Sequence, residues 1–203
     1  MTNEFGVLRE QDVDADPLAQ FQRWFAGAAG TIPFAEAAAL ATADADARPS
    51  VRMVLIKGWD ERGFVFYSNH DSRKGKELSA NAHAALLFHW QPLGRQVRLE
   101  GPVERVEEAE SDRYFESRTR ASQLGAVESA QSRTIDSRDE LDQRVRQLQN
   151  SLEGQPVLRP TWWGGYRLQP LSYEFWLHQE DRLHDRIRYL REESGWRVER
   201  LQP

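Results

Sequence analysis

Residues 174–186 read Glu-Phe-Trp-Leu-His-Gln-Glu-Asp-Arg-Leu-His-Asp-Arg and are the most informative stretch of this chain. Arg182, His184 and Arg186 stand at every second position, shortly after Trp176. In an extended segment such positions point to one face, so the spacing predicts a cationic cluster able to hold a planar, anionic ligand. A charged strand facing water is the alternative, and for an isolated triplet of this kind it is the more common outcome.

The composition is that of a small enzyme without disulfides. The 203 residues fit a single domain with its own core, and no apolar run approaches the ~20 residues needed to span a bilayer. Cys is absent and the five His are scattered, so neither disulfides nor a metal site is predicted. A net charge of −5 argues against nucleic-acid binding. Because residues 1–5 lack the features of a secretory signal, we expect a cytoplasmic protein that binds neither nucleic acid nor membrane.

The predicted elements are mostly strands joined by short turns. Asp16 and Pro17 open an N-terminal helical segment at about 16–30, and Ser137 with Glu140 forms a capping box for a later helix. Strands are predicted at 38–42, 51–57, 64–68, 84–90, 96–106, 166–170, 172–176, 186–191 and 196–201, and further helices at 72–81, 107–118 and 137–153. The order is not alternating βαβ, which favours one antiparallel α+β domain over 1–203, a barrel or sheet with peripheral helices.

An anion site is predicted where the helix at 72–81 begins. Ser72 occupies the N-cap and is followed by Arg73 and Lys74, so backbone N–H groups, a hydroxyl and two cations come together. A capped surface helix without a ligand is the alternative. Neither a Gly-x-Gly-x-x-Gly turn nor a P-loop is present, so a nucleotide-like cofactor would have to be held by side chains and barrel edges.

The motifs of the chain resemble, in order, those of the pyridoxamine 5′-phosphate oxidases, which are FMN enzymes of vitamin B6 metabolism. The C-terminal region, about 162–203, carries the pattern E-F/Y-W, five residues, R-L-H-D-R. Earlier motifs are R-x-V-L-x-K from Arg52 to Lys57, Y-S…S-R-K from Tyr67 to Lys74, R-Q-V at Gln96, Y-F-x-S-R…S from Tyr114 to Ser122, and Q-S at Gln131. The resemblance spans about Leu8 to Pro203. It implies the antiparallel FMN-binding split barrel, a homodimer in which both chains contribute to each flavin site.

The resemblance also implies roles for individual residues. FMN contacts would come from Arg52, Met53, Val54, Leu55, Ile56, Lys57, Tyr67, Ser68, Ser72, Arg73, Lys74, Gln96, Gln131, Ser132, Trp176 and Arg186. The substrate phosphate would be held by Lys57, Tyr114, Arg118 and Ser122, a plausible clamp because phosphate offers several strong acceptors. Arg182 and His184 would lie over the substrate as the catalytic pair, positioning it and supporting charge or proton transfer at C4′.

The implied reaction is the oxidation of pyridoxine or pyridoxamine 5′-phosphate to pyridoxal 5′-phosphate, with O₂ as acceptor and H₂O₂ as product. One alternative is a related FMN oxidase acting on another planar acid, as in phenazine biosynthesis; the retained phosphate clamp argues against it. Another is a non-catalytic protein that binds FMN or pyridoxal phosphate; retention of Arg182 and His184 argues against it. The sequence leaves open which substrate is preferred and whether an allosteric pyridoxal phosphate site exists.

Three positions depart from the family pattern, mostly on the substrate side. Leu177 stands where the signature has Gln, His or Gly. The family's Arg and Tyr that close over the substrate have no counterparts in residues 1–5, and its acidic residue aligns near Phe34. A lid excludes water and completes a site, so we expect intact FMN binding with a more open, more permissive substrate pocket.

Overall fold

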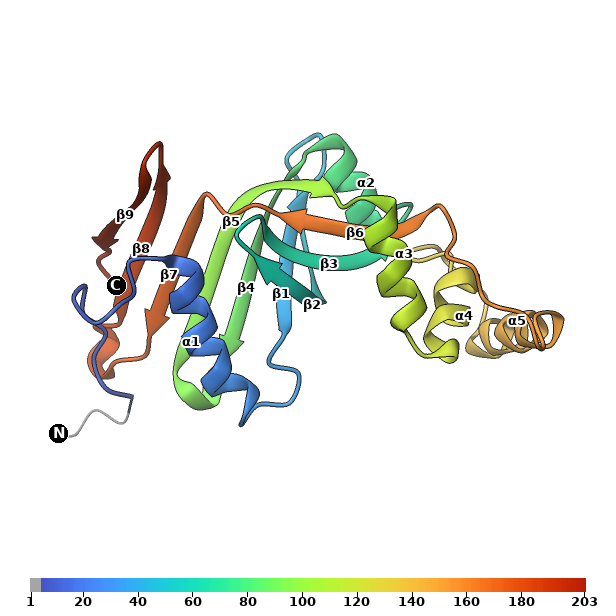
Figure 1. Cartoon of the computed structure of the whole chain (residues 1–203), viewed down its shortest axis with the longest axis horizontal. Helices are drawn as coiled ribbons and strands as arrows, with labels where there is room; N and C mark the ends of the chain where they lie inside the picture. The colour runs from blue at the N-terminus through green and yellow to red at the C-terminus, as the bar shows by residue number, and fades with distance from the viewer. Residues whose placement is uncertain (1–4) are drawn as a thin grey trace.

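Six antiparallel strands close into a barrel, and three more extend the sheet on one side (Figure 1). The computed structural model describes residues 5–203. In this range the strands are β1 (Ala37–Ala43), β2 (Pro49–Asp60), β3 (Gly63–Asn69), β4 (His83–Trp90), β5 (Arg95–Arg105), β6 (Trp163–Leu168), β7 (Ser172–Leu177), β8 (Asp185–Glu192) and β9 (Gly195–Arg200). The order β4-β1-β2-β3-β6-β5 closes because β4 also pairs with β5, and β7, β8 and β9 follow β5. The predicted antiparallel barrel is confirmed.

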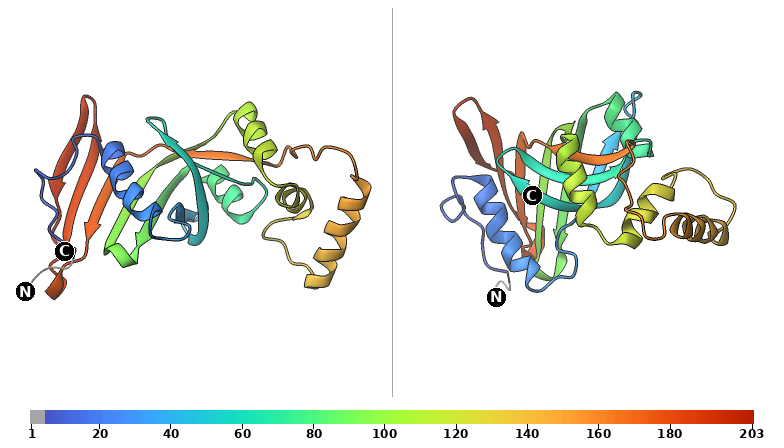
Figure 2. Two further views of the ribbon diagram at one scale, coloured as in Figure 1. Left: turned by 60° about the horizontal axis from the view of Figure 1, so that its bottom comes forward. Right: turned by 45° about the vertical axis from the view of Figure 1, so that its right-hand side comes forward.

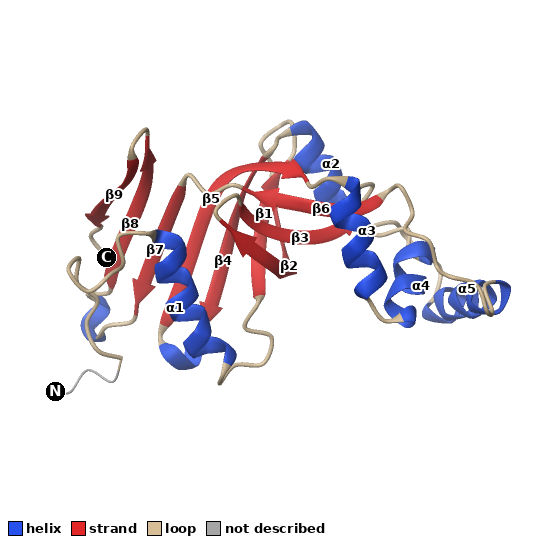
Figure 3. Ribbon diagram, in the orientation of Figure 1, coloured by secondary structure: helices blue, strands red, loops and turns tan. Residues whose placement is uncertain are grey.

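The helices lie around the barrel rather than between its strands (Figure 3). They are α1 (Pro17–Ala29), α2 (Arg73–Ala80), α3 (Glu108–Ser117), α4 (Arg120–Glu128) and α5 (Arg138–Ser151). Both orientations of Figure 2 place α4 and α5 at the end of the molecule opposite to β8 and β9. Within residues 5–203, no helix combines the length and the apolar character that crossing a membrane requires.

Helix α1 forms where the sequence predicts it and packs an aromatic face against the barrel. The Asp16 carboxylate accepts a hydrogen bond from the Leu18 N–H at 3.0 Å, and Pro17 begins the first turn. Phe21 is fully buried, with its ring centroid 4.8 Å from that of Phe64 and 5.0 Å from that of Phe88. Burial of such a side chain contributes about 1.5–3 kcal/mol to stability, so the helix is fixed to the barrel by its apolar side.

A second, smaller core lies beneath α3 and α4. It contains Phe115, Leu124, Val157 and Trp163, all buried. Helix α4 was not predicted from the sequence: the chain turns after α3 and restarts a helix at Thr119, whose Oγ1 accepts a hydrogen bond from the Ser122 N–H. This core joins the helices to β6 and so fixes one wall of the site described below.

The segment between β7 and β8 corrects one prediction. Leu177 pairs with Asp185 in an antiparallel hairpin, so the residues between them must reverse the chain direction. They contain a 3₁₀ turn at Glu180–Arg182, in which Asp181 and Arg182 have φ of 56° and 64°. The expectation that Arg182, His184 and Arg186 share one face of a strand is therefore wrong. Residues 1–4 belong to the N-terminal segment in which the family's lid residues have no counterparts, and they lie outside the described part of the chain.

Candidate active site

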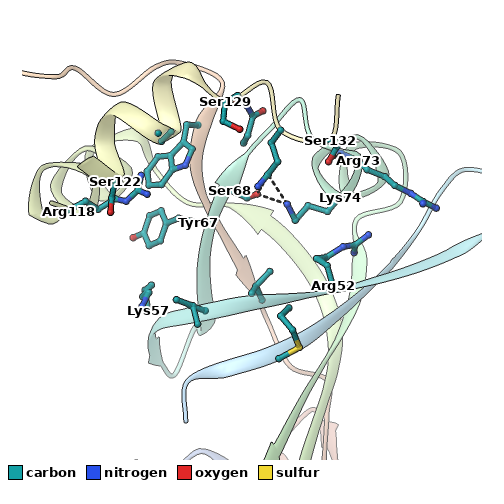
Figure 4. A pocket seen from close by; sticks show the side chains of 18 of the residues that line it. Arg52, Lys57, Tyr67, Ser68, Arg73, Lys74, Arg118, Ser122, Ser129 and Ser132 are labelled. Atoms are coloured by element: carbon teal, nitrogen blue, oxygen red, sulfur yellow. Dashed lines mark hydrogen bonds between the residues drawn. The ribbon is translucent and has the colours of Figure 1, made fainter. Parts of the chain in front are cut away.

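A pocket of about 810 Å³ opens between β2, β3 and the helices α2, α3 and α4 (Figure 4). Among the described residues that line it are five cations and no carboxylate: Arg52, Lys57, Arg73, Lys74 and Arg118. The chain as a whole carries a net charge of −5. The lining of this pocket is therefore cationic although the chain is acidic, which favours an anionic ligand.

Lys74 is the buried cation of the pocket. Its Nζ donates hydrogen bonds to Ser68 Oγ and Gln131 Oε1, both at 2.8 Å, and the residue is 7% exposed (Figure 4). Burial, reinforced by the positive charge of Arg52, lowers the pKa of Lys74 to about 8, while Glu77 acts in the opposite direction. The amine remains mostly protonated at neutral pH but has lost hydration, a cost that a bound anion would offset.

The start of α2 brings Lys74 to the pocket through a tight local structure. Ser72 is the N-cap, as predicted, and its Oγ accepts a hydrogen bond from the Gly75 N–H at 3.3 Å. A Cβ on Gly75 would lie 2.1 Å from the carbonyl oxygen of His70, so only glycine lets the helix pack so closely on the turn after β3. Ser72 is fully buried and does not line the pocket.

Glu77, which the sequence analysis missed, is a buried carboxylate one turn further along α2. Its Oε2 accepts hydrogen bonds from Thr42 Oγ1, Ser50 Oγ and Arg52, and its Oε1 accepts one from Arg73 Nε at 2.8 Å. Burial by itself raises the pKa of Glu77, but these hydrogen bonds outweigh it and lower the pKa to about 2. The i,i+4 spacing from Arg73 was the available sequence signal.

An aromatic stack forms the opposite wall of the pocket. The ring of Tyr114 lies 3.9 Å from that of Tyr67, centroid to centroid, and is nearly parallel to that of Trp163. Arg118 ends α3 as its C-cap and places its guanidinium 4.9 Å from the Trp163 ring centroid, a favourable cation–π geometry. Burial lowers the pKa of Arg118, which nevertheless stays a cation.

One buried donor of Arg118 indicates an anion-binding position. Its NH1 is buried and has no hydrogen-bond partner among the described residues, although buried donors are nearly always paired. Lys57, Tyr114 and Ser122 line the same pocket, so the four residues predicted as a phosphate clamp are brought together. An anion with several acceptor oxygens would satisfy the unpaired donor.

The remaining predicted residues form a second group outside this pocket. Gln96 pairs with Trp176, and Trp176 with Arg186, in one row across β5, β7 and β8. Arg182 and His184 lie on the loop between β7 and β8, and none of these five residues lines the pocket. Figure 1 shows that loop at the end of the molecule away from α4 and α5. Ile56 also misses the pocket, because it is 2% exposed in the barrel core.

His184 is held in a defined tautomer. Its Nδ1 lies 3.1 Å from the backbone N–H of Gln179, which donates to it. The neutral ring must then carry its proton on Nε2. Burial, followed by the neighbouring His178 and Arg182, lowers the pKa of His184 below its usual value, so the side chain offers an N–H donor at neutral pH.

Asp185 anchors the loop that carries Arg182 and His184. This buried carboxylate accepts hydrogen bonds from the Leu8 N–H at 3.0 Å, Gln179 Nε2 at 2.6 Å and Arg200 NH1 at 2.7 Å. The N-terminal segment, the β7–β8 loop itself and β9 therefore meet at one side chain, which braces the loop from both sides.

Leu177 and Phe34, two of the positions that depart from the family pattern, lie in different structural environments. Leu177 is buried at the end of β7 and belongs to the main core. Phe34 is 73% exposed, with φ of 55°. Two residues later, Glu36 places a carboxylate oxygen 3.5 Å from Lys57 Nζ, so this chain has an acidic side chain beside the clamp that the sequence comparison overlooked.

Two family matches cover most of the chain. The family described as pyridoxamine 5′-phosphate oxidase matches residues 29–152, and the pyridoxine 5′-phosphate oxidase C-terminal dimerisation region matches residues 163–203. The chain belongs to the pyridoxamine 5′-phosphate oxidase family. The second match contains β6 to β9 and thus all of the second residue group except Gln96.

Individual relatives agree with this membership. A pyridoxine/pyridoxamine 5′-phosphate oxidase from Rubrobacter xylanophilus is 54% identical over 97% of this chain and 91% of its own length. One of the same name from Cupriavidus taiwanensis is 51% identical over 100% of this chain and 96% of its own. Among solved structures, PhzG from Burkholderia lata in complex with tetrahydrophenazine-1-carboxylic acid has a TM-score of 0.90 at 34% identity, covering 97% of this chain and 98% of PhzG.

Proposed function

We propose that this chain is an FMN-dependent oxidase that converts pyridoxine or pyridoxamine 5′-phosphate to pyridoxal 5′-phosphate, with O₂ as acceptor and H₂O₂ as product. The observation that carries the proposal is a pocket with two separate anion-binding ends. Lys74 lies at one side with Ser68 and Gln131, and Arg118 lies at the other (Figure 4). A flavin mononucleotide and a B6 phosphate ester supply one phosphate each, and relatives above 50% identity bear the name of this activity.

The donor set at the Lys74 end fits FMN. A dehydrated amine, nearby guanidinium groups and the Ser132 hydroxyl suit a dianionic phosphate, while the exposed Met53 and Leu55 beside the pocket suit an apolar ring edge. When bound, FMN would take up the hydride from C4′ of the substrate and pass the electrons to O₂.

The other residues bind and orient the substrate. We assign the substrate phosphate to Arg118, with Lys57, Tyr114 and Ser122 as further contacts. His184 would donate its Nε2–H to the oxygen or nitrogen on C4′, and Arg182 would add positive charge there. These roles place the reacting carbon between fixed groups, which is the main contribution that a protein makes to cofactor chemistry.

We propose that a second copy of the chain completes each pocket. Arg182, His184 and the row from Gln96 to Arg186 do not meet the pocket of their own chain. A twofold axis would bring them to the pocket of a partner. Val51 and Met53, on β2 at the pocket edge, are 69% and 64% exposed, and apolar side chains exposed in a row are typical of a surface that another protein covers.

The protein should therefore sediment as a homodimer at micromolar concentration. The expected mass is about twice the 23.5 kDa of the chain, because a monomer would contain only the Lys74 and Arg118 parts of each site. Sedimentation velocity with absorbance at the flavin band checks mass and cofactor together. A monomer that retains flavin and turns over substrate would contradict the two-chain site.

The reaction is tested most directly by anaerobic spectroscopy. The purified protein should show a flavin spectrum, and pyridoxine 5′-phosphate added without oxygen should bleach the flavin band. Admission of air should restore the colour and release H₂O₂. A flavin spectrum that does not change with either phosphorylated substrate would overturn the proposed activity.

Arg118→Ala should raise the KM for pyridoxine 5′-phosphate by about 10- to 100-fold, the equivalent of one charged hydrogen bond at ~1.5–3 kcal/mol. Flavin content should not change, since Arg118 lies at the other end of the pocket. Unphosphorylated pyridoxine should be used equally poorly by variant and wild type. Arg113→Ala, which removes an exposed cation of α3 outside the pocket, is the matched control.

The likeness to PhzG favours one second candidate, an FMN oxidase of a planar carboxylic acid. A carboxylate needs fewer donors than the four clamp residues offer, so phosphate is the better fit. If wild type oxidises pyridoxine and its phosphate equally well, this second candidate becomes the better supported function.

The cytoplasmic location stays a prediction, which cell fractionation with an antibody against the chain would test.

A further inference from the structure

Glu77 links the two arginines at the Lys74 end of the pocket although it does not line the pocket itself. Its side chain is 5% exposed, and its two oxygens contact the guanidinium groups of Arg52 at 3.1 Å and Arg73 at 2.8 Å. A buried carboxylate survives only when it is paired and hydrogen-bonded. Here the pairing serves two cations from different elements, β2 and α2.

The contacts fix Arg52 almost completely. Its NH1 donates to the Leu40 carbonyl oxygen and to Thr42 Oγ1, and its NH2 donates to Ser50 Oγ and Glu77. Both terminal nitrogens of Arg52 are therefore occupied, and its position is set by Glu77 and its neighbours. Arg73, which is 62% exposed, is tied to the cluster through Nε alone.

The same carboxylate affects the charge of Lys74. The charged groups that act on this amine are Arg52 from β2, which disfavours its protonated form, and Glu77 from α2, which favours it. Its other partners, Ser68 of β3 and Gln131 of the loop after α4, are neutral. With Glu77 ionised, the cluster with Arg52, Arg73 and Lys74 has a net charge of +2, which matches a phosphate dianion.

We propose that Glu77 is a positioning residue of the cofactor-phosphate end, which fixes Arg52 and Arg73 beside Lys74 through its two carboxylate oxygens. The inference rests on the proposed function, because it assigns this end of the pocket to the phosphate of FMN. If only the charges were counted, removing the nearby carboxylate would be expected to strengthen the binding of an anion. The proposal predicts the opposite.

The Glu77→Gln variant tests the proposal through the pH dependence of FMN affinity. Apoprotein is titrated with FMN between pH 7 and 9, and the dissociation constant is read from the quenching of flavin fluorescence. In wild type the affinity should begin to fall near pH 8, where Lys74 loses its proton. Without Glu77, the fall should begin at a lower pH. The dissociation constant at pH 7.5 should rise about tenfold, because weaker protonation of Lys74 adds to the loss of the shared partner of Arg52 and Arg73.

A shorter acid separates charge from geometry. Glu77→Asp keeps the charge but cannot reach both guanidinium groups, so its affinity should drop several-fold while the pH at which binding weakens stays that of wild type. If Glu77→Gln does not fold, the affinity and pH dependence of Glu77→Asp test the proposal instead. Glu110→Gln, which breaks a bidentate ion pair with Arg167 outside the pocket, controls for loss of a carboxylate as such and should leave both quantities unchanged.

The outcomes distinguish this inference from the proposed function. If wild type does not bind FMN, or Lys74→Met binds it as well as wild type, the assignment of the pocket fails. If Lys74→Met loses FMN but Glu77→Gln keeps wild-type affinity and pH dependence, or binds more tightly, the role of Glu77 is overturned and the pocket assignment stands. If Glu77→Gln binds FMN more weakly but keeps the pH dependence of wild type, Glu77 has only a structural role and the proposal is overturned.

Discussion

Replacing Arg73 and Lys74 together by alanine should give a protein that purifies almost free of flavin. Each charge-assisted contact is worth about 1.5–3 kcal/mol, so FMN affinity should fall by roughly two to four orders of magnitude. Most of the loss should come from Lys74, because Arg73 is largely exposed and its Nε is already bound to Glu77. The ratio of flavin to protein absorbance and the dissociation constant of each single variant check this division.

The single variant Lys74→Met should also stabilise the apoprotein. The folded state lowers the pKa of Lys74 from 10.5 to about 8, so folding disfavours its charged form. This cost is fully present below pH 8 and disappears as the pH rises toward 10.5. The melting temperature of apo Lys74→Met should exceed that of wild type at pH 7, with a smaller difference at pH 9.5. Lys76→Ala, an exposed lysine of the same helix, is the control, and unchanged flavin content in Lys74→Met would contradict the phosphate site.

Arg182→Ala and His184→Ala should each lower turnover by about two to three orders of magnitude while FMN remains bound. Both side chains would act on the reacting carbon, where loss of a fixed donor costs ~2.7–4 kcal/mol in comparable sites. Neither residue belongs to the Lys74 cluster, so the flavin spectrum should be that of wild type. Loss of flavin in either variant would indicate that these residues bind the cofactor and not the substrate.

Activity at low substrate concentration should return when two impaired variants are co-expressed. An Arg182→Ala chain has an intact pocket, and an Arg118→Ala chain has an intact loop. Random pairing makes half of the dimers mixed, and each mixed dimer contains one complete site, so about a quarter of wild-type activity should be restored at low substrate concentration. Co-expression of Lys57→Ala with Arg118→Ala should restore nothing, because both changes damage the same pocket. Failure of the first pair to recover would exclude a site shared between chains.

The barrel and its first helix could be predicted because local rules and burial agree there. Asp16 and Pro17 marked the start of α1 correctly, and Ser137 caps α5 through the Glu140 N–H as its capping box predicted. The Arg52 to Lys57 strand was also found, although β2 extends beyond it at both ends. These elements follow from capping chemistry and apolar periodicity, both of which are visible in single segments.

The features that were missed depend on contacts between distant segments. The reversal at Asp181 and Arg182 follows from the pairing of β7 with β8, which the charge spacing of 182–186 does not reveal. The burial of Lys74 requires Ser68 and Gln131, from two other parts of the chain. The resemblance to the family supplied the candidate site residues, and their division into two groups became visible only in the fold.

The anchoring of Asp185 has a practical consequence for how the protein can be labelled. Leu8, near the start of the described residues, and Arg200, in β9, both donate hydrogen bonds to this carboxylate, and Figure 1 shows β9 on the same side as the β7–β8 loop. Labels attached next to Leu8 or Arg200 would crowd the loop that carries Arg182 and His184. The turn after α5, at Gly154, is exposed, does not line the pocket and has φ of 71°. It is the better position for an inserted tag or fluorophore.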